Sequence, residues 1–330
     1  MADKSFSLQH ILEAAQRISP YIVRTPVLNS PQLDEMAGCK VFVKTEGLQK
    51  TGSFKIRGAL NKLLSLSVAE REKGVITYSA GNHAQGVAAG ARILNCPSVV
   101  VMPNTAPKIK IENTRWWGAE VVLFDPYRQT REEIAEQIMQ ERRMTFISPF
   151  DDYYVMAGQG TAGLELCEQM EAMDVTPHVL LVNCSGGGLS SGAITAVRSR
   201  HPEVDCYVVE PKGGEKMAWS LLSGKPERVP APLKTIMDGV AGPVAGQRTL
   251  DVLLKQQVKA LSVNDYEAAQ GLKAAFSMLK IVVEPGAAVS LAAILAKKAD
   301  FSGKNVALIS SGANVDASVF ASILIDKEYI

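Results

Sequence analysis

The stretch Val179-Leu180-Leu181-Val182-Asn183-Cys184-Ser185-Gly186-Gly187-Gly188-Leu189 joins a short aliphatic run to three consecutive glycines. A run of this length is typical of a buried strand, and we expect the next helix to open at Ser190. Consecutive glycines let the backbone approach a ligand closely, and a helix N-terminus favours an anion there. The stretch therefore predicts a strand, a phosphate-binding loop and a helix.

The same alternation of short β-branched runs and helical segments continues through most of the 330-residue chain. It predicts an α/β fold with a mainly parallel sheet and helices on both faces. Strands are predicted at 41–43, 75–78, 99–101, 121–123, 179–182, 206–209 and 306–309. Helices are predicted at 58–66, 84–94, 106–117, 131–142, 190–199 and 216–222.

Two loops that are rich in charge or proline, near 70–74 and 148–152, interrupt this pattern. We expect them to bound a small domain of residues 73–150. That domain would be inserted into a large domain made of residues 1–72 and 151–330.

The composition excludes several classes of function. Lys and Arg number 35 and Asp and Glu 34, which argues against a nucleic-acid or membrane partner. The apolar run at 286–296 is too short to span a bilayer. The five cysteines are widely spaced without a Cys-x-x-Cys pair, which indicates reduced thiols and no zinc site. We therefore expect a cytoplasmic protein.

A second stretch, Lys50-Thr51-Gly52-Ser53-Phe54-Lys55-Ile56-Arg57-Gly58, places Lys55 between two large apolar residues and near two other cations. Burial and neighbouring positive charge both lower the pKa of a lysine, and the neutral amine can form a Schiff base. The alternative is an ordinary surface lysine at the start of a helix that Ser53 caps.

Three further loops follow predicted strands or precede a helix. Ser79-Ala80-Gly81-Asn82-His83 offers backbone amides to a carboxylate, with a capped turn as the alternative; His83 could be a base or a positional residue. Glu284 could be a ligand partner or a first-turn acid. Ser311 could donate to a ring nitrogen or belong to an ordinary turn.

A reactive lysine, a carboxylate loop, a phosphate loop and a late hydroxyl together supply the contacts that pyridoxal phosphate requires. A nicotinamide dinucleotide site is a rival, because Glu210 ends the strand after the glycine loop. However, the spacing of Gly186, Gly188 and Gly192 is one residue too long for that fingerprint. A non-catalytic binding module on an α/β scaffold is a further alternative.

With Ala157-Gly158-Gln159-Gly160-Thr161, these loops resemble in their order the fold type II pyridoxal phosphate enzymes. The match is to the serine/threonine dehydratase (threonine ammonia-lyase) and serine racemase family, and it runs from about Thr25 to Asp316. The resemblance implies a fold like the tryptophan synthase β subunit, with two open, mainly parallel twisted sheets. It also implies pyridoxal 5'-phosphate, an amino-acid substrate and a homodimer.

The resemblance implies that Lys55 binds the cofactor as a Schiff base, with Phe54 packed on the pyridine ring. The other cofactor-binding positions that it implies are Asn82 at the phenolic oxygen, Ser185, Gly186, Gly187, Gly188 and Leu189 at the phosphate, Gly239 and Glu284 near the ring, and Ser311 at the ring nitrogen. The implied substrate-binding residues are Ser79, Ala80, Gly81, Asn82 and His83.

Racemases of this family carry a serine where this chain has Ala80, and an asparagine where it has Phe150. An acid or base on only one face of the α-carbon favours elimination over racemisation, because racemisation requires proton transfer on both faces. The resemblance thus implies dehydration and deamination of a 3-hydroxy amino acid, such as L-threonine or L-serine, to a 2-oxo acid and ammonia. Dehydration of hydroxyaspartate or of another hydroxylated or diamino acid derivative, for example from hydroxyectoine breakdown, remains an alternative, as does serine racemisation.

Metal-binding members of the family use the segment that aligns with Glu210, Gly214 and Lys216. Glu210 and Gly214 could ligate a cation, but a protonated Lys216 cannot. We therefore predict no metal, and our hypothesis is that the Lys216 ammonium, paired with Glu210, takes its place. The alternative is a rearranged, solvated loop.

Overall fold

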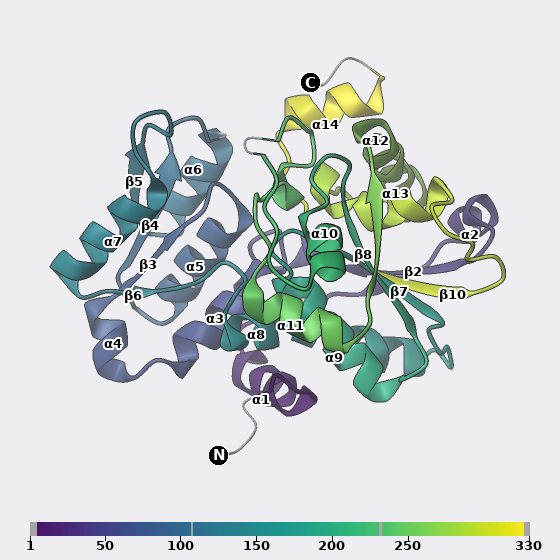
Figure 1. Cartoon of the computed structure of the whole chain (residues 1–330), viewed down its shortest axis with the longest axis horizontal. Coiled ribbons are helices and arrows are strands. Elements are labelled where there is room, and N and C mark those ends of the chain that lie inside the picture. The colour runs from purple at the N-terminus through teal and green to yellow at the C-terminus, as the bar shows by residue number, and fades with distance from the viewer. Residues whose placement is uncertain (1–4, 107, 231–232, 327–330) are drawn as a thin grey trace.

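The computed structural model describes residues 5–106, 108–230 and 233–326. Its strands form two separate sheets, one in each of two units that lie side by side (Figure 1). The six-stranded sheet has the order β1 (Val27–Leu28), β2 (Lys40–Thr45), β10 (Asn305–Ser310), β7 (Val179–Asn183), β8 (Asp205–Pro211) and β9 (Lys259–Val263). The four-stranded sheet has the order β5 (Glu120–Phe124), β4 (Ser98–Pro103), β3 (Val75–Tyr78) and β6 (Thr145–Phe146).

Only the β1–β2 pairing is antiparallel among the described strands, so the predicted α/β fold with mainly parallel sheets is confirmed. The four-stranded sheet draws all its strands from residues 75–146. This lies within the segment 73–150 that we propose as an inserted small domain. The division into a large domain of residues 1–72 and 151–330 and an inserted small domain of residues 73–150 stays a prediction.

Helices cover both faces of each sheet. They are α1 (Leu8–Ile18), α2 (Pro31–Ala37), α3 (Lys55–Ser65), α4 (Val68–Lys73), α5 (Asn82–Ile93), α6 (Lys108–Trp116), α7 (Arg131–Arg142), α8 (Tyr153–Glu171), α9 (Gly188–Arg200), α10 (Lys216–Ser223), α11 (Gln247–Lys255), α12 (Asp265–Ala274), α13 (Val289–Leu295) and α14 (Ala317–Leu324). Short turns of 3₁₀-helix are η1 (Glu46–Leu48), η2 (Asp238–Val240) and η4 (Pro285–Ala287), and a π-helical turn, η3 (Ala275–Leu279), ends α12.

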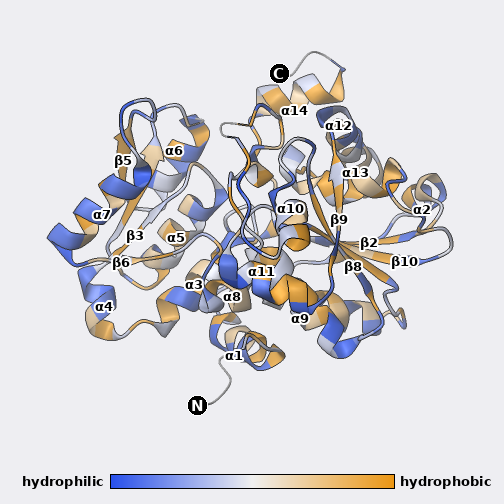
Figure 2. Cartoon of the chain, in the orientation of Figure 1, coloured by the Kyte–Doolittle hydropathy of each residue, from blue (hydrophilic) through white to orange (hydrophobic). Residues whose placement is uncertain are grey.

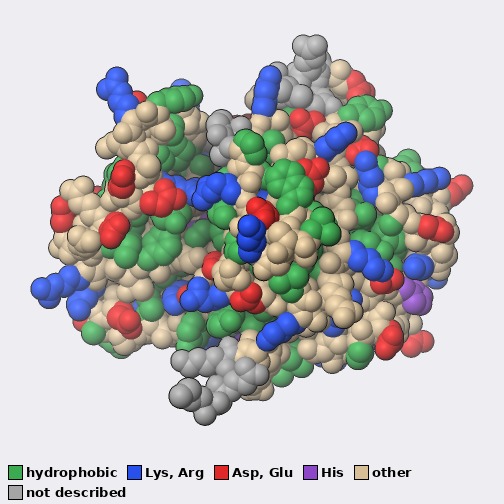
Figure 3. Space-filling model, viewed as in Figure 1, with side chains coloured by type: hydrophobic (Ala, Val, Ile, Leu, Met, Phe, Trp, Pro, Cys, Tyr) green, Lys and Arg blue, Asp and Glu red, His purple; other side chains and the backbone are tan. Residues whose placement is uncertain are grey.

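Alternate side chains of one strand enter the two opposite cores of the large sheet. Val41 and Val43 pack with α12 and α13, whereas Phe42 between them packs with α8 and α9. Strands of both sheets and helices such as α13 and α14 are largely hydrophobic, whereas α7 is largely hydrophilic (Figure 2). Acidic and basic side chains are interspersed on the face seen in Figure 3. No helix among the described residues is long and apolar enough to cross a membrane.

Each predicted strand and helix has a counterpart, with shifts of a few residues at the ends. The helix after the glycine loop begins at Gly188, two residues before the expected Ser190. The helix expected at 106–117 is α6, and residue 107 lies outside the described residues. Sequence reasoning missed β1, β6 and β9, of which the first two have only two residues each.

Helix α8 was also missed, because it is buried almost all round and lacks an amphipathic stripe. Its glycines allow neighbouring helices to approach. A Cβ on Gly158 would lie 2.4 Å from the carbonyl oxygen of Arg57 in α3. A Cβ on Gly192 of α9 would lie 2.3 Å from the carbonyl oxygen of Met156. Helix α8 therefore lies between α3 and α9 and packs closely against both.

A buried network of four charged side chains joins α3, α8 and the end of β2. The Arg57 guanidinium binds Glu46 through Nε (2.7 Å) and Nη2 (2.8 Å), and Glu165 through Nη1 (2.7 Å) and Nη2 (2.9 Å). Lys44 Nζ donates to Glu165 Oε2 at 2.7 Å. Because both carboxylates receive charge-assisted bonds from Arg57, their desolvation is offset.

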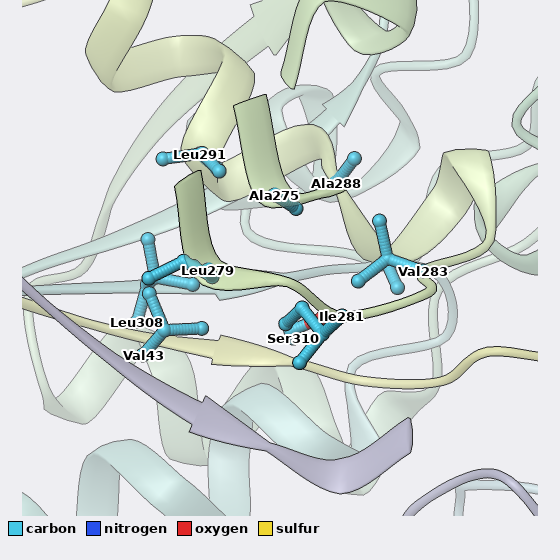
Figure 4. A pocket seen from close by; sticks show the side chains of 10 residues that line it. Val43, Ala275, Leu279, Ile281, Val283, Ala288, Leu291, Leu308 and Ser310 are labelled. Carbon is cyan, nitrogen blue, oxygen red and sulfur yellow. The ribbon is translucent and has the colours of Figure 1, made fainter. Parts of the chain in front are cut away.

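A small cavity lies between strand β10, the π-helical turn η3 and helix α13 (Figure 4). It has a volume of about 10 Å³, and its lining is apolar apart from Ser310. That volume is at the lower limit for one water molecule, so the cavity is a packing void and no ligand site.

Replacing Arg57 with Met should leave the Glu46 and Glu165 carboxylates buried without a bidentate partner. We expect the free energy of unfolding to fall by about 3–5 kcal/mol, measured by urea denaturation. The matched control is Arg24→Ala, because Arg24 and Glu168 form an exposed pair; its loss should cost under about 1 kcal/mol. Equal losses in the two variants would contradict this account of the network.

Candidate active site

Lys55 is the first residue of α3, and the loop before it is bound to the loop after β10. The Phe54 N–H donates to the carbonyl oxygen of Ser311 at 3.1 Å. The Ala313 N–H donates to the carbonyl oxygen of Gly52 at 2.8 Å. Two segments more than half the chain apart thus form one wall around Lys55.

The Lys55 amine donates to the carbonyl oxygen of Pro149 at 2.8 Å and lies 5.2 Å from the centre of the Phe54 ring. Burial lowers the pKa of Lys55 to about 8, although the Glu284 carboxylate partly opposes this shift. The expectation that Lys50 and Arg57 would help to lower this pKa is wrong. Lys50 is exposed, and Arg57 is neutralised by its two carboxylate partners.

The loop from Ser79 to His83 follows β3 and leads into α5. Within it Ala80 is exposed, whereas His83 is buried with Nε2 3.2 Å from the carbonyl oxygen of Ile147. Burial, and secondarily the charge of Lys55, lower the pKa of His83 to about 3. The imidazole is therefore neutral at physiological pH, which disfavours a role as a general acid.

Asn82 forms the centre of a polar chain across the site. Its amide donates to Glu284 Oε1 at 2.5 Å and accepts from the Asn314 amide at 2.7 Å. Burial raises the pKa of Glu284 to about 7, and its Oε2 has no hydrogen-bond partner among the described residues. A Cβ on Gly239 would lie 3.7 Å from Glu284 Oε1, so Gly239 borders the same group.

The glycine loop, Ser185 to Leu189, lies between β7 and α9. Gly187 has a φ of 95°, which favours glycine, and a Cβ on Gly186 would lie 2.4 Å from the Phe150 ring. The carbonyl oxygen of Gly186 accepts from Thr249 Oγ1 at 2.6 Å and from the Gly246 N–H at 3.1 Å. These bonds hold the loop against the start of α11.

Ser311 is oriented by Asn183, a residue that sequence reasoning did not select. The Asn183 amide donates to Ser311 Oγ at 3.1 Å, and its carbonyl oxygen accepts from Ser290 Oγ at 2.5 Å. Asn183 could have been suspected only as a polar residue at the end of an aliphatic strand. Because Oγ accepts this bond, the proton of Ser311 is free to be donated elsewhere.

Gln159 is another residue to which the sequence assigned no role. A Cβ on Gly188 would lie 2.7 Å from its Oε1, and one on Gly58 would lie 3.0 Å from its Nε2. The amide is buried, and neither of its polar atoms has a partner among the described residues. A buried amide beside the glycine loop indicates a polar ligand there.

Residues 18–312 match the family described as "Pyridoxal-phosphate dependent enzyme". The chain belongs to this family. It is 38% identical over 318 residues to an L-threo-3-hydroxyaspartate ammonia-lyase of Saccharomyces cerevisiae, covering 96% of each chain. It is 40% identical to an L-threonine ammonia-lyase of Thermotoga maritima, covering 96% of this chain and 78% of that one. The structure of maize serine racemase superposes with a TM-score of 0.90 at 34% identity, covering 98% of both chains.

The site of this pyridoxal-phosphate dependent enzyme fits its cofactor. The start of α9 offers backbone amides and a favourable dipole to the phosphate, and the glycines let this loop pack closely against Phe150, Thr249 and Gln159. The unpartnered groups of Gln159 and Glu284 suit a polar guest. The lowered pKa of Lys55 suits a carbonyl-binding amine.

Lys216 is the first residue of α10, and its ammonium lies beside Glu210 of β8, in the segment that aligns with the metal site of other family members. It lies 3.2 Å from Glu210 Oε1, 3.3 Å from the carbonyl oxygen of Gly214 and 3.2 Å from that of Val240. The side chains of Lys216 and Glu210 are both fully buried. Among the described residues no group of three or more His, Cys, Asp or Glu side chains could hold a metal ion.

This geometry supports the hypothesis that the Lys216 ammonium supplies the positive charge that a cation would bring. We expect the activity and melting temperature of the enzyme to be unchanged by EDTA and by added magnesium. Both are measured on the same preparation, with metal content checked by elemental analysis. Loss of activity with the chelator and recovery with magnesium would contradict the hypothesis.

Proposed function

We propose that this enzyme eliminates water from a 3-hydroxy amino acid such as L-threonine or L-serine, giving an imine that is then hydrolysed to a 2-oxo acid and ammonia. The observations that carry this proposal are the pKa of Lys55, lowered to about 8, and the presence of an exposed alanine at position 80 in the proposed substrate loop. One face of the substrate thus has a base, and the exposed Ala80 offers no acid or base from the loop. The names of the ammonia-lyase relatives support the same chemistry.

In this proposal the residues around the site divide the work. Lys55 binds the cofactor, and Phe54 lies beside it. The phosphate is held by Ser185, Gly186, Gly187, Gly188 and Leu189. Asn82, Gly239 and Glu284 line the ring, and the Ser311 hydroxyl donates to the ring nitrogen without charging it. Backbone amides of Ser79, Ala80, Gly81, Asn82 and His83 bind the substrate carboxylate.

When bound, pyridoxal phosphate withdraws electrons from the substrate and makes its α-proton acidic. The Lys55 amine, freed by the substrate amine, is the base that takes this proton. The proton taken from Cα and the hydroxyl lost from Cβ together leave the substrate as one water molecule. After release, the product imine is hydrolysed in solution to the 2-oxo acid and ammonia. Burial lowers the pKa of Lys55 to about 8, so about half of the amine is uncharged at pH 8 and most of it at higher pH, as this role requires.

We also propose that the enzyme acts in the cytoplasm as a homodimer. All five cysteines are buried and free, which suits a reducing compartment. Light scattering coupled to size-exclusion chromatography measures the oligomeric state.

The direct test of the proposed function is a screen of L-serine, L-threonine and the isomers of hydroxyaspartate for release of 2-oxo acid and ammonia. We expect at least one to be consumed, and we expect Lys55→Ala to abolish turnover and the near-visible absorbance of the cofactor. Lys50→Ala, an exposed lysine in the same loop, is the matched control and should retain both. Undiminished turnover in Lys55→Ala would refute the assignment.

Replacing Ala80 with Ser should place an acid or base on the face opposite Lys55. We expect D-serine formation from L-serine to rise at least about tenfold over the unmodified enzyme. Chiral chromatography of the remaining substrate measures it, and Ala80→Gly controls for the change in loop size. If Ala80→Ser forms no more D-serine than Ala80→Gly, the one-sided mechanism is wrong.

A further inference from the structure

Lys110 connects the two units of the molecule at the edge of the site. It lies on α6 of the four-stranded unit, and its Nζ is 2.5 Å from Asp238 Oδ2 at the start of η2. The two partners differ in their surroundings. The Lys110 side chain is only 7% exposed, whereas that of Asp238 is 53% exposed.

The Lys110 ammonium also faces the proposed substrate loop. A Cβ on Gly81 would lie 3.7 Å from its Nζ. Burial alone would lower the pKa of Lys110, but the charges of Asp238 and then Glu284 outweigh it, so this pKa is raised. A charged ammonium therefore forms part of the wall next to the residues that would bind the substrate carboxylate.

Because Asp238 is much more exposed than Lys110, replacing Asp238 by another carboxylate at the Lys110 ammonium has a low free-energy cost. A buried ammonium requires a counterion, because leaving it unpaired carries a large desolvation penalty. The half-exposed Asp238 carboxylate can be hydrated after it loses Lys110. An incoming carboxylate could thus take the place of Asp238, whereas a neutral substrate side chain could not.

We propose that Lys110 is a specificity-determining residue that binds the second carboxylate of an acidic 3-hydroxy amino acid, such as 3-hydroxyaspartate. Asp238 holds Lys110 when the substrate side chain is neutral. This inference rests on the proposed function and names the substrate class within it. It assigns Lys110 to the side chain of the substrate, while the loop amides bind the carboxylate at Cα.

The first test compares kcat/KM for threo-3-hydroxyaspartate with that for L-serine in the unmodified enzyme, Lys110→Met and Lys110→Arg. Methionine keeps the aliphatic length of lysine without its charge. We expect the ratio of the two kcat/KM values to fall about 10- to 100-fold in Lys110→Met, the usual effect of losing a charge-assisted hydrogen bond. Lys110→Arg should lose less, because it retains the charge.

The second test measures binding to the holoenzyme by isothermal titration calorimetry, with succinate as a dicarboxylate and butyrate as its monocarboxylate match. In Lys110→Met we expect the Kd of succinate to rise at least about tenfold more than that of butyrate. Asp238→Asn should act in the opposite direction and tighten succinate, because it releases the ammonium. Circular dichroism establishes that each variant is folded.

Equal changes for both substrates and for both ligands in Lys110→Met would overturn the inference and reduce Lys110 to a link between the units. If serine or threonine is turned over but the ratio does not depend on Lys110, only this inference fails. If no hydroxy amino acid yields a 2-oxo acid, the proposed function fails. Selective loss of succinate binding would still support the role of Lys110.

Discussion

The bidentate clamp of Arg57 on two buried carboxylates is the constraint on which the site depends. It joins the 3₁₀ turn after β2, which carries Glu46, to α8, which carries Glu165. Arg57 itself lies two residues after Lys55 in the first turn of α3. Because a planar guanidinium with four short bonds cannot rotate freely, the start of α3 is held in one place. The backbone of Lys55, which lies in the same turn, is therefore held in place as well.

Buried polar groups elsewhere in the site are arranged in the same manner. Asn183 holds Ser311 from one side and is itself held by Ser290. Asn314 holds Asn82, which in turn binds Glu284. In both Asn183 and Asn82, the amide nitrogen donates to one neighbour and the amide oxygen accepts from another. These chains of hydrogen bonds set the directions of the side chains. Among the buried polar atoms without hydrogen-bond partners, those of Gln159 and Glu284 lie where the ligand is expected.

Three lysines of this protein show how burial and partners together decide what a charge does. Lys55 lacks a directly paired carboxylate, and its pKa falls to about 8, which suits a nucleophile and base. Lys216 is fully buried and lies within 3.3 Å of three oxygens, the contacts on which the hypothesis that it replaces a metal is based. Lys110 keeps its charge through Asp238, a half-exposed carboxylate that water can hydrate once another carboxylate has taken its place.

The sequence by itself determined the alternation of strands and helices and the loops that follow the strands. These features depend on local periodicity and on glycines, both of which can be read within a few residues. It also located Lys55, the glycine loop and Ser311. Only the tertiary structure revealed Asn183, Gln159 and Lys110, because the groups beside them are distant in the chain. Asn183 and Ser311 are 128 residues apart, as are Lys110 and Asp238, and Gln159 lies beside Gly58 and Gly188. The tertiary structure likewise decided why the pKa of Lys55 is low, since the nearby cations in the sequence are exposed or neutralised and burial alone remains.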